Sequence, residues 1–540
     1  MTWFYRVRFA LCVLCLLLFA RPGYSADIRT MGLIFRDSTA DFPGYTLFAP
    51  MSYTVAYLID NNGMMVHSWT GIYWPGLSVN LCPNGLLLRT CQVGNGVFFG
   101  GGGSGGRVEL VDWDGAVVWA FGYSSSTYCQ HHDAIMLPNG NILMIAWELK
   151  SREEAIAAGR NPSLLVYNAL WPDHLIEVNP VTDSVVWEWH VWDHLIQDYD
   201  STRPNYGDPR AHPELIDLNY VSGMAVADWN HCNSIAYNQE LDQVIISSRQ
   251  FSEAWVIDHS TTIEQARSHS GGRYGRGGDL LYRWGNPRTY RRQETIGQTL
   301  FGQHDAQWIE PGLPGAGNIL LFNNGYGRVP TFSTVDEFVP PMDSAGFYHL
   351  GTDSAYGPAA PIWQYVAPVP DSLYSSLISG CQRLPNGNTL ICSGLNGTML
   401  EVTPDGRQVW KYVNPVTRYG PQEQGRVLPS GANPVFKVRR YPIDYSGLRG
   451  RNLDPLGPIE QYPQAIQEEP VIRLVDNRRS LMVKDVVTLS GAEFADVADP
   501  TGRKLIRLHP GPNDIHNLAP GIYFLVGPAG TQKTRLVKTR

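Results

Sequence analysis

The sequence has few charged residues and no excess of basic ones. Charged side chains make up 17% of the 540 residues, and 50 Asp and Glu outweigh 42 Lys and Arg, giving a formal net charge of −8. A nucleic-acid-binding protein needs a basic face, so this composition does not favour such a partner. The phosphate-loop pattern G-x-x-x-x-G-K-[ST] is also missing. The glycine run GNGVFFGGGGSGGR from Gly94 is therefore expected to be a flexible loop.

Long apolar runs are confined to the N-terminus. There the segment LCVLCLLLF follows Arg6 and Arg8, and small residues follow it near Ala26. This order is typical of an export signal, and the apolar part is shorter than the ~20 residues of a membrane-spanning helix. We expect a signal peptide over residues 1–26 and an exported protein. It would be secreted or at the cell surface, with the periplasm as a transit or alternative location.

Cysteine is scarce, and two of the 8 cysteines fall inside the expected signal. The other six would meet a compartment in which disulfides persist. A two-residue hairpin at Asn386-Gly387 would place Cys381 directly opposite Cys392, within disulfide reach. The spacing allows this bridge, and two reduced core cysteines are the alternative.

Turn-forming and aromatic residues are abundant, with 54 Gly, 38 Pro, 16 Trp and 27 Tyr. This composition favours short strands joined by tight turns, so we expect an all-β fold. Short apolar segments that end in tryptophan recur six times, at Trp69, Trp119, Trp189, Trp284, Trp363 and Trp410.

A turn and an alternating apolar strand follow each of these tryptophans. The six segments are CPNGLLLRT, LPNGNILMIAW, YNQELDQVIISSR, PGAGNILLF, LPNGNTLIC and LPSGANPVFKVRR. Six repeats of the same tryptophan–turn–strand order indicate a six-bladed β-propeller over residues 27–445. A β-sandwich of repeated hairpins is the alternative.

Two long insertions interrupt the repeats. One follows Trp147 and contains a helical candidate at Arg152–Ala158, and the other is an aromatic, acidic run after Trp189. Long insertions usually project from one face and shape a binding site.

The repeat stops after Tyr441. A Pro-, Gln- and Glu-rich stretch predicts a linker over residues 446–471, and short strands resume over 472–540. The closing segments TGRKLIRL, LAPGIYFL and TRLVKTR resemble sorting domains of type IX secretion cargo. That resemblance implies a small β-sandwich and the secretion machinery as a partner. A sandwich that only caps the propeller is the alternative.

Histidines fall at equivalent places in consecutive repeats. Counting back from each turn, the inner strands begin at Leu77, His132, His231, His304, Ser379 and Glu423. Such positions converge on the central channel of a propeller, where a ligand can be held from several sides. Three histidines in register therefore predict a functional site. Single histidines elsewhere are read as structural: His174, His194, His212 and His259.

Segments of four repeats carry a family resemblance: QHHDAIMLPNGNILMIAWE, DWNHCNSIAYNQELDQVIISSRQFSEAWVIDHSTT, GGDLLYRWGNPRTY and GQHDAQWIEPGLPGAGNILLFNNGYGR. Together with GYTLFAP and LIDNNGMMVHSW, they resemble the bacterial arylsulfate sulfotransferases over Gly44–Tyr445. The resemblance implies a six-bladed propeller that moves a sulfuryl group from a phenolic sulfate ester to a phenol. It also implies a transiently sulfated histidine and no nucleotide sulfate donor.

The resemblance places His231, His304 and Arg328 at anion-binding positions of the family, with His132 as a further catalytic candidate. Arg249 and Asn324 are candidates for substrate binding, although Arg249 could equally lie in a salt bridge at the rim. We expect no cofactor. Metal binding by His131 and His132 is not expected, since adjacent strand residues point to opposite faces.

The sequence departs from the family in the fifth repeat. The family leads us to expect a nucleophilic histidine there, but no histidine lies between His349 and His509, and the equivalent position is Ser379. Either another of the three channel histidines is the nucleophile, or the protein transfers nothing. The alternative function is a surface propeller that binds anionic or sulfated aromatic ligands without turnover.

Overall fold

The computed structural model describes residues 29–98, 100, 102–221, 226–294, 296–351, 354–462, 471–472, 480–489, 494–526 and 533–539. The expected signal peptide lies outside these residues. The chain forms two compact units, Met1–Gln461 and Tyr462–Arg540.

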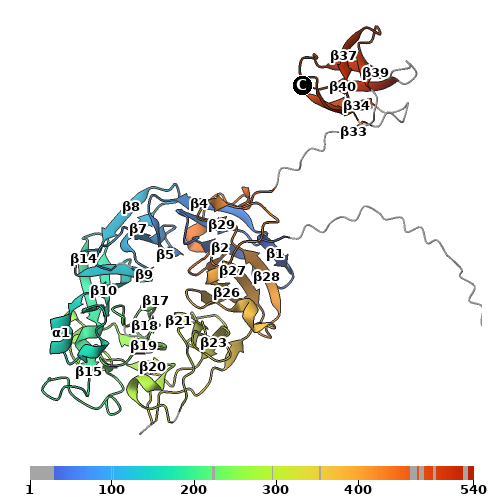
Figure 1. Ribbon diagram of the computed structural model, residues 1–540. Coiled ribbons are helices and arrows are strands. Elements are labelled where there is room, and N and C mark those ends of the chain that lie inside the picture. Colours follow the sequence, from blue (N-terminus) through green and yellow to red (C-terminus); the bar gives the residue numbers. More distant parts are fainter. Residues whose placement is uncertain are drawn as a thin grey trace, which may run out of the picture. The chain divides into compact units, whose positions relative to one another are not determined.

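The first unit is a six-bladed propeller, with six antiparallel sheets arranged around a central axis (Figure 1). Blade one comprises β5 Trp74–Leu81, β6 Leu87–Gln92, β7 Gly106–Val111 and β8 Val117–Gly122. Blade two comprises β9 Tyr128–Met136, β10 Ile142–Glu148, β13 Asp173–Asn179 and β14 Ser184–His190. Blade three comprises β17 Cys232–Asn238, β18 Gln243–Ser248, β19 Glu253–Asp258 and β20 Tyr282–Trp284.

Of the remaining blades, five and six combine strands from both ends of the propeller sequence. Blade four comprises β21 His304–Trp308, β22 Ile319–Asn323, β23 Thr334–Phe338 and β24 Trp363–Tyr365. Blade five comprises β25 Gly380–Arg383, β26 Thr389–Ser393, β27 Thr398–Val402, β28 Gln408–Val413 and, outermost, β1 Gly32–Arg36. Blade six comprises β31 Arg439–Pro442, β2 Gly44–Phe48, β3 Val55–Ile59, β4 Met64–Thr70 and β32 Gly457–Pro458.

The six recurrent tryptophans lie on the fourth strand of each blade, counted from the channel. Each indole N–H donates to the turn between the third and fourth strands of the next blade. The acceptors for Trp69, Trp119, Trp189, Trp284, Trp363 and Trp410 are Asp112 O, Asp183 Oδ1, Gly278 O, Pro358 O, Pro404 O and Asn61 O. The repeat seen in the sequence is therefore the set of contacts that joins neighbouring blades.

Blade six differs from the prediction. The segment from Leu428 was expected to be its second strand and Glu423 to begin its inner strand, but the innermost strand is β31, which pairs with β2 near the N-terminus. Glu423 forms only an isolated bridge with Gln461. The expectation failed because the N-terminal strands close the ring and supply the rest of this blade.

The Cys381–Cys392 disulfide is not formed. Cys381 pairs with Ile391, and its neighbour Gly380 pairs with Cys392, so the two cysteines point to opposite faces of the sheet. All six described cysteines are free. The turn has three residues between Leu384 and Asn388 rather than two, with Gly387 in the left-handed region at φ 88°. The extra residue shifts the register by one.

The insertions contain short elements. The predicted helix is confirmed as α1 Arg152–Ala157, and a second helix, α2 Ile263–Ala266, follows β19. Neither helix in the described part of the chain is long enough to cross a membrane. The other short elements are β11 Lys150–Ser151, β12 Ala169–Leu170, β15 Leu195–Ile196, β16 Ile216–Asp217, β29 Val416–Thr417, β30 Gly420–Pro421 and the 3₁₀ turns η1 Pro162–Leu164, η2 Val191–His194, η3 Pro287–Tyr290, η4 Pro370–Leu373, η5 Gly394–Asn396 and η6 Ser446–Leu448.

The predicted linker is partly built into the propeller. Within it, β32 pairs with β4, and Ile459 packs in a core cluster of the first unit. This pairing was not visible in the sequence because its partner strand lies almost 400 residues earlier.

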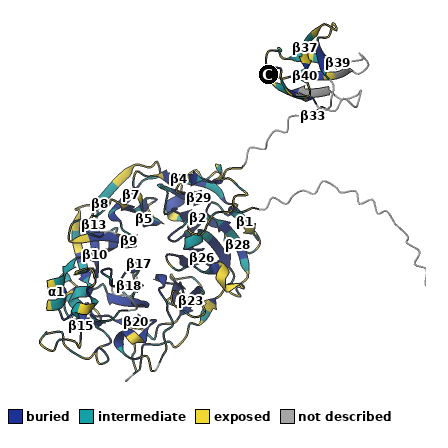
Figure 2. Ribbon diagram, viewed as in Figure 1, coloured by how far each residue is buried: buried dark blue, intermediate teal, exposed yellow. Residues whose placement is uncertain are grey.

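The second unit is a small β-sandwich. One sheet contains β33 Val471–Ile472, β35 Val486–Leu489 and β38 Gly511–Asp514, and the other contains β34 Ser480–Val483, β40 Lys533–Lys538, β39 Gly521–Val526, β36 Ala495–Ala498 and β37 Lys504–Leu508. Val487 from one sheet packs with Val497 and Leu525 from the other in a separate core. The buried strands of each unit are dark blue in Figure 2.

Candidate active site

Three consecutive inner strands bring His132, His231 and His304 to the same part of the channel. His132 lies in β9, His231 directly precedes β17, and His304 begins β21. His132 and His231 both have φ 51°, a left-handed conformation that bulges the strand. Their rings are 4.7 Å apart between centroids. The predicted convergence of His132 and His231 is therefore present.

The other three blades contribute apolar side chains at this level. Leu77, Ile378 and Phe436 form one buried cluster. The Phe436 ring lies 5.9 Å from that of His132 and 6.4 Å from that of His304. The site thus has a histidine half from blades two to four and an apolar half from blades five, six and one. Phe436 takes the place expected for Glu423.

His231 is oriented by a carboxylate that the sequence reading missed. Its Nδ1 lies 2.5 Å from Asp228 Oδ2, and Asp228 Oδ1 accepts a hydrogen bond from Trp147 Nε1 at 2.9 Å. Burial alone would raise the pKa of Asp228, but His231 and the hydrogen bonds lower it. The carboxylate therefore holds the proton on Nδ1, which leaves a lone pair on Nε2 of His231. In the sequence, the signal for this role of Asp228 was its position three residues before His231.

His132 is oriented through its neighbour. His131 Nε2 lies 2.8 Å from Asp173 Oδ1, and the Nδ1 atoms of His131 and His132 are 2.7 Å apart. Asp173 holds the proton on His131 Nε2, so His131 Nδ1 accepts from His132 Nδ1. The Nε2 of His132 then carries a lone pair. The expectation that the two histidines face opposite sides was wrong, because the left-handed φ of His132 breaks the strand alternation.

His304 has both ring nitrogens engaged. Its Nδ1 donates to Asn324 Oδ1 at 2.8 Å, and its Nε2 accepts from the backbone N–H of Ile378 at 3.1 Å. Asn324 in turn donates to Ser375 O and Ile378 O. Asn324 therefore positions His304 and joins blades four and five. His304 has no lone pair left for attack in this arrangement.

Two of the buried histidines of the site, His132 and His304, are neutral. Burial, followed by the neighbouring His231 and His131, holds the pKa of His132 well below its ordinary value. Burial and then the nearby Arg249 lower the pKa of His304 to about 3. A neutral imidazole carries a lone pair that can attack or accept a proton, and of these two rings only His132 keeps that lone pair unengaged by the described residues.

Two of the predicted arginines, Arg249 and Arg328, are not paired with a carboxylate in the described part of the chain. Arg249 lies close enough to His132 and His304 to lower their pKa values. The Arg249 guanidinium lies over the Tyr326 ring at 5.2 Å. Arg328 lies over Phe332 at 4.4 Å, and its Nε and Nη2 are buried without a hydrogen-bond partner among the described residues. Burial lowers the pKa of both groups. Guanidinium groups without a carboxylate partner, lying next to aromatic rings, suit an anionic aryl ligand.

The glycine run covers the histidines. The backbone N–H of His132 donates to Gly103 O at 2.8 Å. A Cβ on Gly103 would lie 2.4 Å from the His132 ring, and one on Gly102 would lie 3.0 Å from the His231 ring. The segment was expected to be only a flexible loop, but Gly102 and Gly103 form a close-fitting wall against the histidine rings that leaves no room for a Cβ at Gly103.

Deeper in the channel the charges are fully paired. Lys437 Nζ lies 2.6 Å from Asp133 Oδ2, and Arg439 Nη2 lies 2.6 Å from Asp305 Oδ1. These residues follow Phe436, His132 and His304 along the inner strands. Beyond them is a cavity of about 600 Å³ that Asp305, Lys437 and Arg439 help to line. The paired network separates this cavity from the histidines.

A family model described as "Arylsulfotransferase (ASST)" matches residues 57–417. The chain belongs to the arylsulfotransferase family. No curated protein matched it in a separate comparison.

Comparison with solved structures gives only distant likenesses. A protein of unknown function from Bacteroides caccae shares 12% identity at a TM-score of 0.40, covering 74% of this chain and 98% of its own. Hydrazine synthase of Kuenenia stuttgartiensis shares 15% at 0.31, with coverages of 53% and 66%. Streptogramin B lyase shares 9% at 0.34, with coverages of 72% and 83%. At these values the likeness carries no information about activity.

This arylsulfotransferase-family chain has Ser379 in blade five at the position where a histidine was expected. Ser379 is buried with φ 90°, and its Oγ accepts a hydrogen bond from Gly394 N at 2.9 Å. Ile378, with φ 52°, takes the strand-bulging conformation that His132 and His231 have in their blades. Ser379 therefore supports the backbone of blade five.

Proposed function

We propose that this protein transfers a sulfuryl group from a phenolic sulfate ester to a phenol through a sulfated histidine, without a nucleotide donor. The observation that carries the proposal is a set of oriented histidines, of which His132 and His304 are neutral, together with two guanidinium groups that lack carboxylate partners in the described chain. An anionic sulfate ester would supply the missing partner charge, and the aromatic rings around the arginines would contact its aryl group.

His231 is the nucleophile in this proposal. Its Nε2 has no hydrogen-bond partner in the part of the chain that the structure describes, whereas both nitrogens of His304 are engaged. Sulfation of Nε2 leaves a cationic ring with a proton on Nδ1, and the adjacent Asp228 carboxylate stabilises that charge. His132 Nε2 also has no hydrogen-bond partner among the described residues, but its Nδ1 faces the His131 ring rather than a carboxylate. Direct contact with an anion therefore favours His231.

The reaction takes two steps. In the first, Nε2 of His231 forms a bond to sulfur, and the bond from sulfur to the aryl oxygen breaks with its electron pair on the departing aryl oxide. In the second, the oxygen of the acceptor phenol attacks sulfur, and the nitrogen–sulfur electron pair returns to Nε2. The phenol proton passes to Nε2 of His132, which is neutral, and from there to solvent. Arg249 and Arg328 stabilise the charge on the sulfuryl oxygens.

Incubation of the mature protein with para-nitrophenyl sulfate, with and without a phenol acceptor, tests the proposal. We expect nitrophenol release that depends on the acceptor and, without the acceptor, a sulfated peptide containing His231. No release and no sulfated peptide between pH 6 and 9 would contradict it.

Binding without turnover is the second candidate function, favoured by the absence of a histidine in blade five. It predicts saturable binding of para-nitrophenyl sulfate, measured by calorimetry, with no product. Loss of that binding in Arg328→Ala would assign it to the same site.

We also propose that the protein is exported and that its C-terminal unit acts as a sorting domain for secretion machinery. The N-terminal signal pattern and the resemblance of the last strands support this proposal. Expression in a host with type IX secretion tests it, with N-terminal sequencing of the external protein. Export that is unchanged after removal of residues 462–540 would contradict the sorting role.

A further inference from the structure

A second group of histidines lies in the insertion region, away from the channel. His194 is in η2, His269 follows α2, and Asp279 precedes β20. His194 Nδ1 and His269 Nδ1 each lie 2.8 Å from the same oxygen, Asp279 Oδ1. Among the described residues, these three side chains form the one group of histidine, cysteine and acidic ligands with all its ligand atoms within 4.8 Å of one another.

The hydrogen bond at Nε2 of His194 determines which ring nitrogen carries the proton. His194 Nε2 lies 2.8 Å from the backbone oxygen of Ala266, which can only accept, so Nε2 carries a hydrogen. In a neutral ring Nδ1 then presents a lone pair toward the Asp279 carboxylate. Two lone pairs repel each other, and 2.8 Å is a hydrogen-bond distance, so a proton lies on this contact unless a metal cation bound to both atoms takes its place.

The surroundings match those of a metal ligand. A ligating histidine usually donates its second N–H to a backbone carbonyl, as His194 does to Ala266. His194 is fully buried and Asp279 nearly so, whereas the His269 side chain is 62% exposed. Two imidazoles and one carboxylate are a donor set that zinc accepts.

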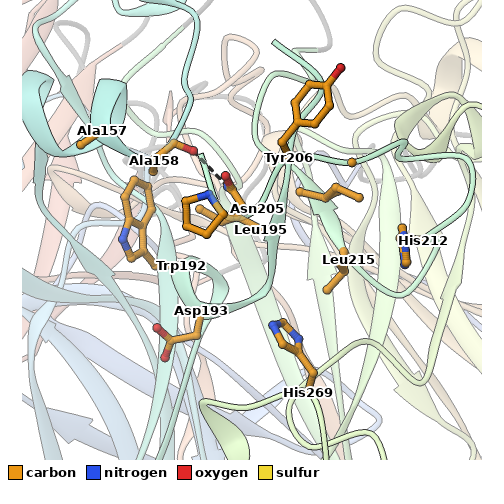
Figure 3. Close-up of a pocket in the computed structure, with 13 residues that line it drawn as sticks. Ala157, Ala158, Trp192, Asp193, Leu195, Asn205, Tyr206, His212, Leu215 and His269 are labelled. Atoms are coloured by element: carbon orange, nitrogen blue, oxygen red, sulfur yellow. Dashed lines mark hydrogen bonds between the residues drawn. The ribbon is translucent and has the colours of Figure 1, made fainter. Parts of the chain in front are cut away.

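The group opens on a cavity. His269 lines a cavity of about 510 Å³ together with Trp192, Asp193, Leu195 and His212, as Figure 3 shows. A three-ligand zinc site leaves its fourth position for water or a bound molecule. Here that position would face the cavity from the His269 side.

We propose that His194, His269 and Asp279 bind a divalent cation of the zinc class through the two Nδ1 atoms and the carboxylate. The fourth position holds water or a small anionic ligand from the cavity. The site connects the insertion after Trp189 with the segment between β19 and β20. It is independent of the sulfuryl-transfer proposal.

Zinc titration of the untagged, EDTA-treated full chain tests the proposal by calorimetry, with elemental analysis after dialysis. We expect one zinc per chain and a rise in the midpoint of thermal unfolding when zinc is added. His269→Ala should weaken zinc binding at least tenfold, and Asp279→Asn should do the same. His269 is exposed, so its removal leaves the buried packing in place.

His212→Ala is the matched control, because His212 lines the same cavity but is not in the ligand group. It should keep one zinc per chain. A wild-type chain that binds no zinc would overturn the proposal and assign the contact to a protonated His194. Equal binding by wild type and His269→Ala would also overturn it.

Discussion

His231 in the channel and His194 in the insertion both place Nδ1 against an aspartate oxygen, at 2.5 and 2.8 Å. They differ at the second nitrogen. Nε2 of His231 has no protein partner among the described residues, whereas Nε2 of His194 donates to a backbone carbonyl. The same histidine–aspartate contact therefore leaves an open lone pair in one place and demands a shared proton or cation in the other. The hydrogen-bond partner of Nε2 therefore determines whether the ring can attack a substrate or must share a proton or cation.

Removing the proposed nucleophile has the largest expected effect. His231→Ala should lower kcat for transfer by about 10³-fold or more and abolish the sulfated peptide, because covalent catalysis loses its attacking atom. Release of para-nitrophenol measures this effect. His349→Ala, at a histidine whose side chain is 68% exposed, should behave as wild type. A fully active His231→Ala variant would move the nucleophile to another residue.

Asp228→Asn tests whether the Asp228 carboxylate orients the His231 ring and holds its proton on Nδ1. An amide can hold either tautomer of His231, so kcat should fall by about 10² to 10⁴-fold. Single-turnover formation of the sulfated peptide measures the step directly. A purely structural role for Asp228 would instead lower the midpoint of thermal unfolding and leave the rate in the folded fraction unchanged.

Arg328→Ala tests whether the unpaired guanidinium binds the sulfuryl group. We expect kcat/KM for para-nitrophenyl sulfate to fall by about 10² to 10³-fold, the cost of removing one oxyanion donor. Arg328→Lys should recover only part of the loss, since lysine keeps the charge but not the two-pronged donor. Equal activity of Arg328→Ala and wild type would remove Arg328 from the site.

Gly103→Ala tests the fit of the glycine wall over the channel histidines. The new Cβ would lie 2.4 Å from the His132 ring, whereas a Cβ on Gly100 meets nothing within 4 Å. The two glycines have nearly equal φ, 81° and 79°, so backbone strain cancels in the comparison. Gly103→Ala should be about 1–3 kcal/mol less stable than Gly100→Ala and less active. Equal free energies of unfolding in urea would show that the segment around Gly103 can shift to accommodate the added methyl group.

His259 is a third histidine with acidic partners, and its titration should make the stability of the protein depend on pH. Burial alone would lower the pKa of His259, but hydrogen bonds to Asp242 and Glu177, at both ring nitrogens, raise it to about 9. The folded pKa exceeds the unfolded value of about 6.5, so this stability is present below pH 6.5 and is lost as pH rises through 9. We expect a loss of about 1–3 kcal/mol across this window. Urea unfolding should show a smaller loss for His259→Gln, and an equal loss would exclude His259 as its source.

Sequence alone determined the repeat and the histidines that share it. Each tryptophan ends a fourth strand and donates to the next blade, so one local pattern was enough to predict six blades. The position of His132 and His231 relative to the following turn was equally local. The family match over residues 57–417 spans these same segments.

Only the tertiary structure decided how the ring closes and which atoms of the site are free. β31 pairs with β2 across about 400 residues, and one extra turn residue separates Cys381 from Cys392. Asp228 and His131 became visible as partners only when the left-handed backbone of His231 and His132 turned the rings toward them. Strand periodicity can place a side chain on a face of a sheet, but lone pairs and protons depend on neighbours from other blades.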